Sequence, residues 1–297
     1  MEIIHKGTPK VSLGMPVYNG EKYIQEALDS LLTQTFTDFE LIISDNASTD
    51  NTSVICQGYA KNDLRIRYIR QDQNKGAIAN FKFVLDEAVG EYFMWVAYDD
   101  LWAPDFLMDA TALLLDKNIN FVFPTFELRS IRLGLAKKFS PEIFRFIESS
   151  DRKWRILHFM ALHYLSFSVN IVYSLFKKEF LQTVWSIQNI SNEGAMGTIV
   201  LSLSRGVMSN SLFSKRYKVI WPGMLPSWLI VLKGMCYKRD VIHNAKKAIE
   251  DFRVYMLSAF PEFETEIQYI YIKYRPFVYD RYYRICSLEN ILVKCCE

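Results

Sequence analysis

Two adjacent carboxylates, Asp99 and Asp100, directly follow a mostly apolar segment, Phe93–Tyr98. An apolar run of this length, shortly after Gly90, is typical of a buried strand. Ligands bind at the carboxyl ends of strands in an open parallel sheet, and paired carboxylates there suit a divalent cation that holds a phosphorylated substrate. The pair can equally cap the helix predicted after Pro104, and this segment alone leaves both interpretations open.

Polar residues also follow each of the three strands predicted upstream. These segments are Pro16–Asn19, Asp45–Asn46 and Asn74–Gly76. Right-handed crossovers between parallel strands place such ends along one edge of the sheet. This convergence supports a ligand site more strongly than any one of the motifs does.

Alternating strand and helix patterns predict the elements that position these residues. The predicted strands are 10–15, 39–44, 65–70 and 93–98, and the predicted helices between them are 19–32, 52–60 and 78–88. Pro16 is expected to end the first strand. Apolar strands in strand, helix, strand order are the unit of a parallel α/β sheet.

Composition limits the class of protein. The chain has 297 residues, 50% hydrophobic and 23% charged, which is typical of a globular protein, and its net charge of +2 does not indicate nucleic-acid binding. Five cysteines without metal-ligand spacing favour free thiols in a reducing compartment, and the four histidines receive no role. Residues 1–10 lack the apolar core of a signal peptide, and the apolar run Trp228–Leu232 is too short to span a bilayer. We therefore expect a cytoplasmic protein, either soluble or peripheral to a membrane.

Five segments between Val11 and Leu107 occur in the order and spacing of a known family. They are Val11–Asn19, Leu31–Glu40, Ser44–Asp50, Gly90–Tyr92 and Asp99–Asp100. This part of the chain resembles the nucleotide-sugar half of family 2 glycosyltransferases, which have the GT-A fold. The resemblance implies an α/β protein with a mixed, mostly parallel, Rossmann-like sheet flanked by helices. No Gln-x-x-Arg-Trp motif occurs, so the chain does not resemble the processive synthases of the family.

The resemblance implies roles for the residues at the strand ends. Pro16 and Tyr18 belong to the donor-binding set, with Tyr18 against the nucleobase, and Asp45 accepts a hydrogen bond from a base N–H, a pattern that suits uracil. Asp99 approaches the ribose and sugar and is counted with the catalytic residues. Asp100 binds Mn²⁺ or Mg²⁺, which neutralises the departing nucleoside diphosphate. The structural alternatives are a half-buried loop tyrosine at Tyr18 and a helix cap at Asp45.

The arginine that would bind the donor phosphates is absent from its expected position. Relatives often carry an arginine just before the asparagine that corresponds to Asn80, and this chain has Ala79 there. Lys75 can supply the missing positive charge, and a solvated loop lysine is an equal alternative.

The second half resembles the acceptor side of the family, with departures. Ser174 stands where relatives have a glycine, and Met196 stands at the place of the catalytic aspartate. Inverting transfer needs a carboxylate that takes the proton from the acceptor hydroxyl. Glu193 is the nearest candidate base, with a solvated loop glutamate as the alternative, and Glu127 is a second candidate.

These observations predict a glycosyltransferase domain over 1–215, with a nucleotide-sugar half over 1–125 and an acceptor half over 126–215. A helical region with aromatic and basic residues is predicted over 216–297. Its tail, Tyr269–Arg284, suits a membrane interface, a packed helix with its cations at the surface, or a homodimer contact, and these alternatives stay open. Cys295 and Cys296 are a weak lipidation signal.

The sequence therefore predicts a metal-dependent, inverting transferase. It would move one sugar from a nucleoside diphosphate, with UDP favoured, to a hydroxyl of a glycan or lipid-linked glycan in the synthesis of a cell-surface polysaccharide or glycoconjugate. One alternative is a non-catalytic relative that binds a nucleotide-sugar and acts as a partner or scaffold. A nucleotidyltransferase is disfavoured, because no Gly-rich, basic phosphate loop follows the first strand.

Overall fold

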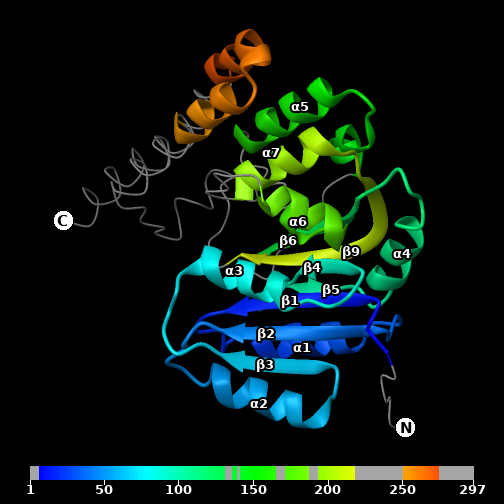
Figure 1. Cartoon of the computed structure of the whole chain (residues 1–297), viewed down its shortest axis with the longest axis vertical. Coiled ribbons are helices and arrows are strands. Elements are labelled where there is room, and N and C mark those ends of the chain that lie inside the picture. Colours follow the sequence, from blue (N-terminus) through cyan, green and yellow to red (C-terminus); the bar gives the residue numbers. More distant parts are fainter. Residues whose placement is uncertain are drawn as a thin grey trace, which may run out of the picture.

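The fold is a mixed α/β sheet covered by helices. The computed structural model describes residues 7–130, 136–138, 141–164, 171–186, 193–217 and 250–273. Over these residues nine strands form one sheet in the order β3-β2-β1-β4-β8-β6-β9-β5, with β7 paired to β6. Figure 1 shows the N-terminal strands and their helices in one half of the molecule and the later helices in the other. The predicted α/β architecture is confirmed.

Four parallel strands form the N-terminal half of the sheet. They are β1 (Val11–Val17), β2 (Phe39–Asp45), β3 (Ile66–Arg70) and β4 (Tyr92–Trp95). Every residue of β1 and β2 is buried, which is the pattern of parallel strands covered on both faces. The connecting helices are α1 (Ile24–Leu32), α2 (Thr52–Asn62) and α3 (Ala77–Asp86), and α3 crosses in front of the sheet in Figure 1.

Two of the predicted strand ends are wrong. Pro16 does not end β1, because it pairs with Ser44 of β2. The Gly14 carbonyl accepts a hydrogen bond from Val96 N–H at 2.9 Å and therefore faces β4. Backbone groups two residues apart in a strand face the same side, so the Pro16 nitrogen also faces β4 but lies beyond the last residue of that strand. The N–H that proline lacks would have no partner in β4, so Pro16 removes no hydrogen bond between β1 and β4. β4 itself ends at Trp95 rather than Tyr98, and the residues up to Asp100 form a turn.

Both parallel and antiparallel pairs occur in the second half of the sheet. β8 (Leu175–Lys177) joins β4 to β6 (Phe121–Ser130) through antiparallel pairs, and β6 lies parallel to β9 (Val207–Tyr217). β5 (Leu101–Trp102) and β7 (Ala136–Lys138) complete the edges. The remaining helices of this half are α4 (Phe106–Leu113), α5 (Arg152–Tyr164), α6 (Lys178–Ser186) and α7 (Glu193–Leu203). β6 crosses the predicted boundary at residue 125, so both halves share one sheet.

A helical C-terminal region is present, as predicted. Helices at 250–259 and 264–273 pack against the core through Phe252, Met256 and Ile267, and Phe260 between them is buried as well. Figure 1 shows these helices beside α5, at the end of the molecule away from β3. No helix in the described ranges is both long and apolar enough to span a membrane. The segment around Trp228, the tail residues from Arg275 onward and the Cys295–Cys296 pair lie outside the described residues.

Candidate functional site

The strand ends predicted to form the site share one edge of the sheet. In the parallel register Val17 pairs with Asp45, and Asp45 pairs with Arg70. These three residues therefore lie side by side at the carboxyl ends of β1, β2 and β3. We call this edge, together with the loops that follow the four parallel strands, the rim.

Hydrogen bonds join the loops after β1 and β2. Asn19 N–H donates to Ser48 Oγ at 2.9 Å, and Thr49 N–H donates back to Asn19 Oδ1 at 2.8 Å. Gly20 N–H donates to Thr52 Oγ1 at 2.8 Å, at the start of α2. Asn19 adopts φ 53°, a left-handed conformation that asparagine tolerates better than most residues. The two loops therefore form one unit that presents Tyr18, whose side chain is exposed.

The loop after β4 contacts this unit through a tight approach at Gly20. A Cβ atom on Gly20 would lie 2.8 Å from Cδ2 of the Tyr98 ring and 2.8 Å from Val17 Cγ2. Only glycine leaves room for the ring. Because Tyr98 directly precedes Asp99 and Asp100, the contact brings the carboxylate pair to the loop that carries Tyr18.

The loop after β3 joins the rim through Asn46. Its Nδ2–H donates to Asn74 Oδ1 at 2.9 Å, and its Oδ1 accepts from Lys75 N–H at 2.9 Å. The exposed Lys75 side chain donates to Gln71 Oε1 at 2.8 Å. The structure thus places the backbone of Lys75 beside the loop after β2 and ties its ammonium group to the end of β3.

Asp45 is buried and hydrogen bonded at both carboxylate oxygens. Oδ1 accepts from Ser48 N–H at 2.8 Å, and Oδ2 accepts from Tyr68 O–H at 2.7 Å and from Arg70 Nη1–H at 3.4 Å. Burial and the bond to Asp45 raise the pKa of Tyr68 to about 12, so the phenol remains a donor. The residue before α2 is Asn51, so Asp45 is not the cap of that helix.

Asp99 and Asp100 do not cap the next helix either. α4 begins at Phe106 with Asp105 at its N-cap, and β5 separates it from the pair. Asp100 is 1% exposed, whereas Asp99 is half-buried. The structure therefore removes the capping interpretation and leaves two carboxylates in the turn that follows β4.

This carboxylate pair fits a divalent metal that also binds phosphate. The described residues contain no group of three or more His, Cys, Asp or Glu side chains that could hold a metal by themselves. Mg²⁺ typically uses one or two carboxylates and completes its coordination with water and substrate phosphates. Two hard oxygen donors in one turn at the rim match the protein's share of that pattern.

Gln34 fixes the segment that follows the pair, a role that sequence reasoning missed. Its Nε2–H donates to Ala103 O at 2.6 Å, and its Oε1 accepts from Leu107 N–H at 3.0 Å. Thr35 N–H donates to Pro104 O at 2.8 Å. The end of α1 therefore holds the segment between β5 and α4, although the residues lie far apart in the sequence.

The residues predicted for the acceptor side lie on α7 and β6. Glu193 is the first residue of α7, and Met196 of the same helix is buried. Glu127 lies on β6 opposite Lys138 of β7 and is buried as well. The buried methionine packs in the core and offers no carboxylate at the position for which the family resemblance predicts a base.

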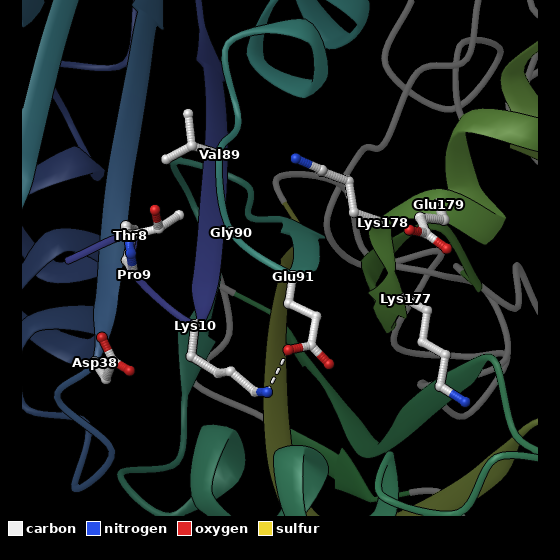
Figure 2. Close-up of a pocket in the computed structure, with 10 residues that line it drawn as sticks. All are labelled: Thr8, Pro9, Lys10, Asp38, Val89, Gly90, Glu91, Lys177, Lys178 and Glu179. Carbon is white, nitrogen blue, oxygen red and sulfur yellow. Dashed lines mark hydrogen bonds and ion pairs between the residues drawn. The ribbon is translucent and has the colours of Figure 1, made fainter.

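A cavity of about 580 Å³ lies at the other edge of the sheet (Figure 2). Lys10, Asp38 and Glu91 line it, and each precedes a parallel strand. Lys10 forms an ion pair with Glu91, and Lys178 Nζ donates to Ala88 O at 3.1 Å. This cavity is therefore at the amino ends of the strands, opposite the rim, and contains none of the predicted donor residues.

Comparisons with known proteins bear on the family and the fold. The sequence profile described as "Glycosyl transferase family 2" matches residues 12–176. TuaG of Bacillus subtilis, a glycosyltransferase named for teichuronic acid biosynthesis, is 34% identical over 120 residues, 40% of this chain and 48% of TuaG. WfgD of Escherichia coli, a UDP-Glc:α-D-GlcNAc-diphosphoundecaprenol β-1,3-glucosyltransferase, is 30% identical over 132 residues, 44% of this chain and 51% of WfgD. The matched region thus spans about half the length of these curated relatives.

Two solved structures share the fold at low sequence identity. Staphylococcus aureus TarS 1–349 in complex with UDP-GlcNAc aligns with a TM-score of 0.55 and 16% identity, covering 94% of this chain and 89% of TarS 1–349. The mannosyltransferase PcManGT from Pyrobaculum calidifontis, in complex with GDP-Man and Mn²⁺, aligns with a TM-score of 0.57 and 17% identity, covering 95% and 74%. These likenesses confirm the GT-A fold. Because the family profile covers more than half of its residues, the chain belongs to glycosyltransferase family 2.

Proposed function

We propose that this chain transfers a single sugar from a nucleoside diphosphate donor, with UDP favoured, to a hydroxyl of a glycan or lipid-linked glycan, with inversion at the anomeric carbon. The observation that carries the proposal is the rim, where hydrogen bonds and the Tyr98–Gly20 contact join the loops of Tyr18, Asp45, Lys75 and Asp99–Asp100. WfgD, which the chain resembles over part of its length, uses a UDP-sugar and a lipid-linked acceptor by its name. A role in the synthesis of a cell-surface polysaccharide follows from this resemblance and from that to TuaG.

The proposed roles follow from the chemistry of each side chain. The exposed Tyr18 ring supplies a face for the nucleobase, and Pro16 shapes the strand end before it. Asp45, which is hydrogen bonded to Ser48, Tyr68 and Arg70, holds in place the part of the rim at which the base is recognised. Asp99 orients the ribose and sugar, and Lys75 contributes positive charge near the donor phosphates.

Asp100 and Asp99 are the residues that would hold Mn²⁺ or Mg²⁺. The ion, when bound with the donor, neutralises charge on the departing diphosphate. PcManGT binds Mn²⁺ together with GDP-Man, which supports the same arrangement here. Glu193 is the proposed base, positioned at the start of α7, that takes the proton from the acceptor hydroxyl as it attacks.

A thermal-shift panel with UDP-, GDP- and dTDP-sugars, with and without Mn²⁺, tests donor binding. We expect a shift that needs both a UDP-sugar and the metal, and that is lost in Asp100→Ala. A metal-dependent shift that survives in Asp100→Ala would contradict the assignment of the ligand. Transfer to lipid-linked acceptors, followed by mass spectrometry of the product, then tests the reaction.

Buried Met196 favours a second candidate, a non-catalytic binder of nucleotide-sugars that acts as a partner or scaffold. The two functions differ in turnover. Hydrolysis or transfer of the donor in the presence of Mn²⁺ supports the enzyme. Saturable donor binding with no turnover on any acceptor supports the scaffold.

A further inference from the structure

Arg70 lies on the rim beside the residues proposed to hold the nucleobase. It is the last residue of β3 and pairs in register with Asp45, which pairs with Val17 immediately before Tyr18. No segment of the family resemblance contains Arg70. Its position nevertheless places a guanidinium group at the same level of the sheet as the proposed base site.

A ligand that approaches this edge meets Arg70 before it meets Asp45. The Asp45 side chain is 0% exposed, whereas the Arg70 side chain is 45% exposed. Oδ2 of Asp45 already accepts from Tyr68 O–H and from Arg70 Nη1–H. The carboxylate is therefore covered, and the guanidinium is the accessible member of the pair.

The guanidinium is also held in place. Its Nη2–H donates to Ser48 O at 2.9 Å, and Ser48 Oγ accepts from Asn19 N–H, next to Tyr18. A guanidinium carries five N–H donors in a rigid plane, and these bonds to Ser48 and Asp45 use two of them. Fixing the plane in advance lowers the entropy lost when further donors bind a ligand.

We propose that Arg70 determines which nucleobase the site accepts, by donating a hydrogen bond to the carbonyl at C4 of a pyrimidine or at C6 of a purine. Asp45 then acts as a positioning residue that holds the guanidinium, rather than as the group that contacts the base. This inference rests on the proposed function and refines it, because it names the chemical class of the donor. Uracil and guanine carry a carbonyl where cytosine and adenine carry an amino group. An amino group there would face another donor, so the site rejects those two bases.

Isothermal titration of the full chain with UDP, GDP, CDP and ADP in the presence of Mn²⁺ tests the inference. We expect the wild type to bind UDP or GDP more tightly than CDP and ADP. In Arg70→Ala, affinity for the preferred nucleotide should fall roughly 10- to 100-fold, the range for a hydrogen bond to a charged group. Affinity for CDP and ADP should change little, so the preference between bases collapses. Arg70→Lys keeps the charge without the planar fork and should recover only part of the preference.

Arg67 provides a matched control on the same strand. Its side chain is 42% exposed and pairs with the buried Glu40 at 3.2 Å and with Glu87 at 2.7 Å, so Arg67→Ala removes the same charge together with these ion pairs. β3 places Arg67 away from the rim, and we expect Arg67→Ala to keep the wild-type preference. Thermal unfolding of each variant shows whether it is folded. Asp45→Asn should also reduce the preference for UDP or GDP over CDP and ADP. If Asp45 only stabilised the fold, its loss would not change this preference.

The outcomes separate the inference from the function on which it rests. A wild type that binds none of the four nucleotides overturns both. A wild type that binds them without a preference for UDP or GDP overturns the inference and leaves donor binding intact. A folded Arg70→Ala variant that keeps the wild-type preference does the same.

Discussion

At the scale of single residues, Tyr68 stabilises the carboxylate that organises the rim. Its O–H donates to the buried Asp45, and burial together with this bond raises its pKa to about 12. An unfolded chain loses the tyrosine proton near pH ~10, so between about pH 10 and 12 the folded state binds more protons than the unfolded state. The free energy of unfolding must therefore fall as pH rises through this window.

Tyr68→Phe should remove the contribution of this phenol to the alkaline loss of stability. Urea unfolding of the variant at several pH values from about 9 to about 11 should show a shallower fall than in the wild type. Tyr59 and Tyr255, whose pKa values burial also raises to about 12, would account for the slope that remains. Equal slopes for variant and wild type would show that Tyr68 does not keep its proton as the structure indicates.

Glu193→Gln tests the proposed base. The substitution keeps the size of the side chain and removes its ability to accept a proton. We expect the rate of sugar transfer to fall by about 10²- to 10⁴-fold, while the affinity for the donor is unchanged. The matched control is Glu179→Gln, since Glu179 lies in the first turn of α6 and lines the cavity at the opposite edge of the sheet. If both variants transfer at the wild-type rate, Glu127 becomes the next candidate.

At the scale of elements, the close approach between the loops after β1 and β4 depends on Gly20. Gly20→Ala would place a Cβ atom 2.8 Å from the base of the Tyr98 ring, so the ring and the loop behind it must move. We expect a loss of stability of about 1–3 kcal/mol, as for other overpacked sites, and weaker metal-dependent binding of the donor. Both follow from displacement of the loop that carries Asp99 and Asp100.

Gly58→Ala is the control for the same chemical change. Gly58 lies within α2, and nothing lies within 4 Å of a Cβ atom built there. Alanine in a helix should stabilise the protein by about 0.5–1 kcal/mol and leave donor binding unchanged. Circular dichroism melts and thermal shifts with donor and Mn²⁺ measure both quantities. A Gly20→Ala variant that behaves like Gly58→Ala would show that the Tyr98 contact is not needed.

Gln34→Leu tests whether α1 positions the carboxylate pair from a distance. The variant leaves Ala103 O and Leu107 N–H without the two bonds they now make, and the buried Leu107 N–H alone should cost about 1–3 kcal/mol when left unsatisfied. We expect a lower midpoint of thermal unfolding and a weaker effect of Mn²⁺ on donor binding. Thr33→Ala is the control, because the bonds of Thr33 Oγ1 among the described residues go to carbonyls of α1, Asp29 O and Ser30 O. A Gln34→Leu variant with an unchanged metal requirement would contradict the proposed link.

Local patterns predicted the parallel strands and their polar ends, because burial on both faces imposes apolar runs that the sequence shows directly. They did not predict the ends of β1 and β4, since the tolerance for Pro16 depends on where the neighbouring strand stops. They also missed Arg70 and Gln34. Arg70 lies outside the five segments of the family resemblance, and its partner Asp45 lies on another strand. The roles of Arg70 and Gln34 depend on contacts between segments that are far apart in the sequence, and the spacing of residues within one segment does not predict these contacts.

At the scale of the whole molecule, two kinds of contact hold the C-terminal helices: apolar burial in the core and charged contacts with α5. Met256 and Ile267 are fully buried. Arg152 pairs with Glu262 at 2.9 Å, and Lys153 pairs with Glu266, with all four charged side chains partly exposed. Arg152 also lies over the rings of Phe260 and Phe263. Exposed ion pairs are screened by water and salt, whereas buried apolar groups are not, so the apolar contacts should dominate.

Ile267→Ala and Glu262→Gln separate these contributions. Ile267→Ala deletes buried methyl groups and should lower the free energy of unfolding by about 2–5 kcal/mol, whereas Glu262→Gln should change it little. Unfolding in urea at low and high salt, with limited proteolysis of residues 250–273, measures stability and docking together. A larger effect of Glu262→Gln than of Ile267→Ala, growing as salt is lowered, would show that charge holds the helices in place. If Ile267→Ala has the larger effect, as we expect, the C-terminal region belongs to the same hydrophobic core as the sheet. Destabilising the C-terminal helices should then lower the stability of the sheet as well.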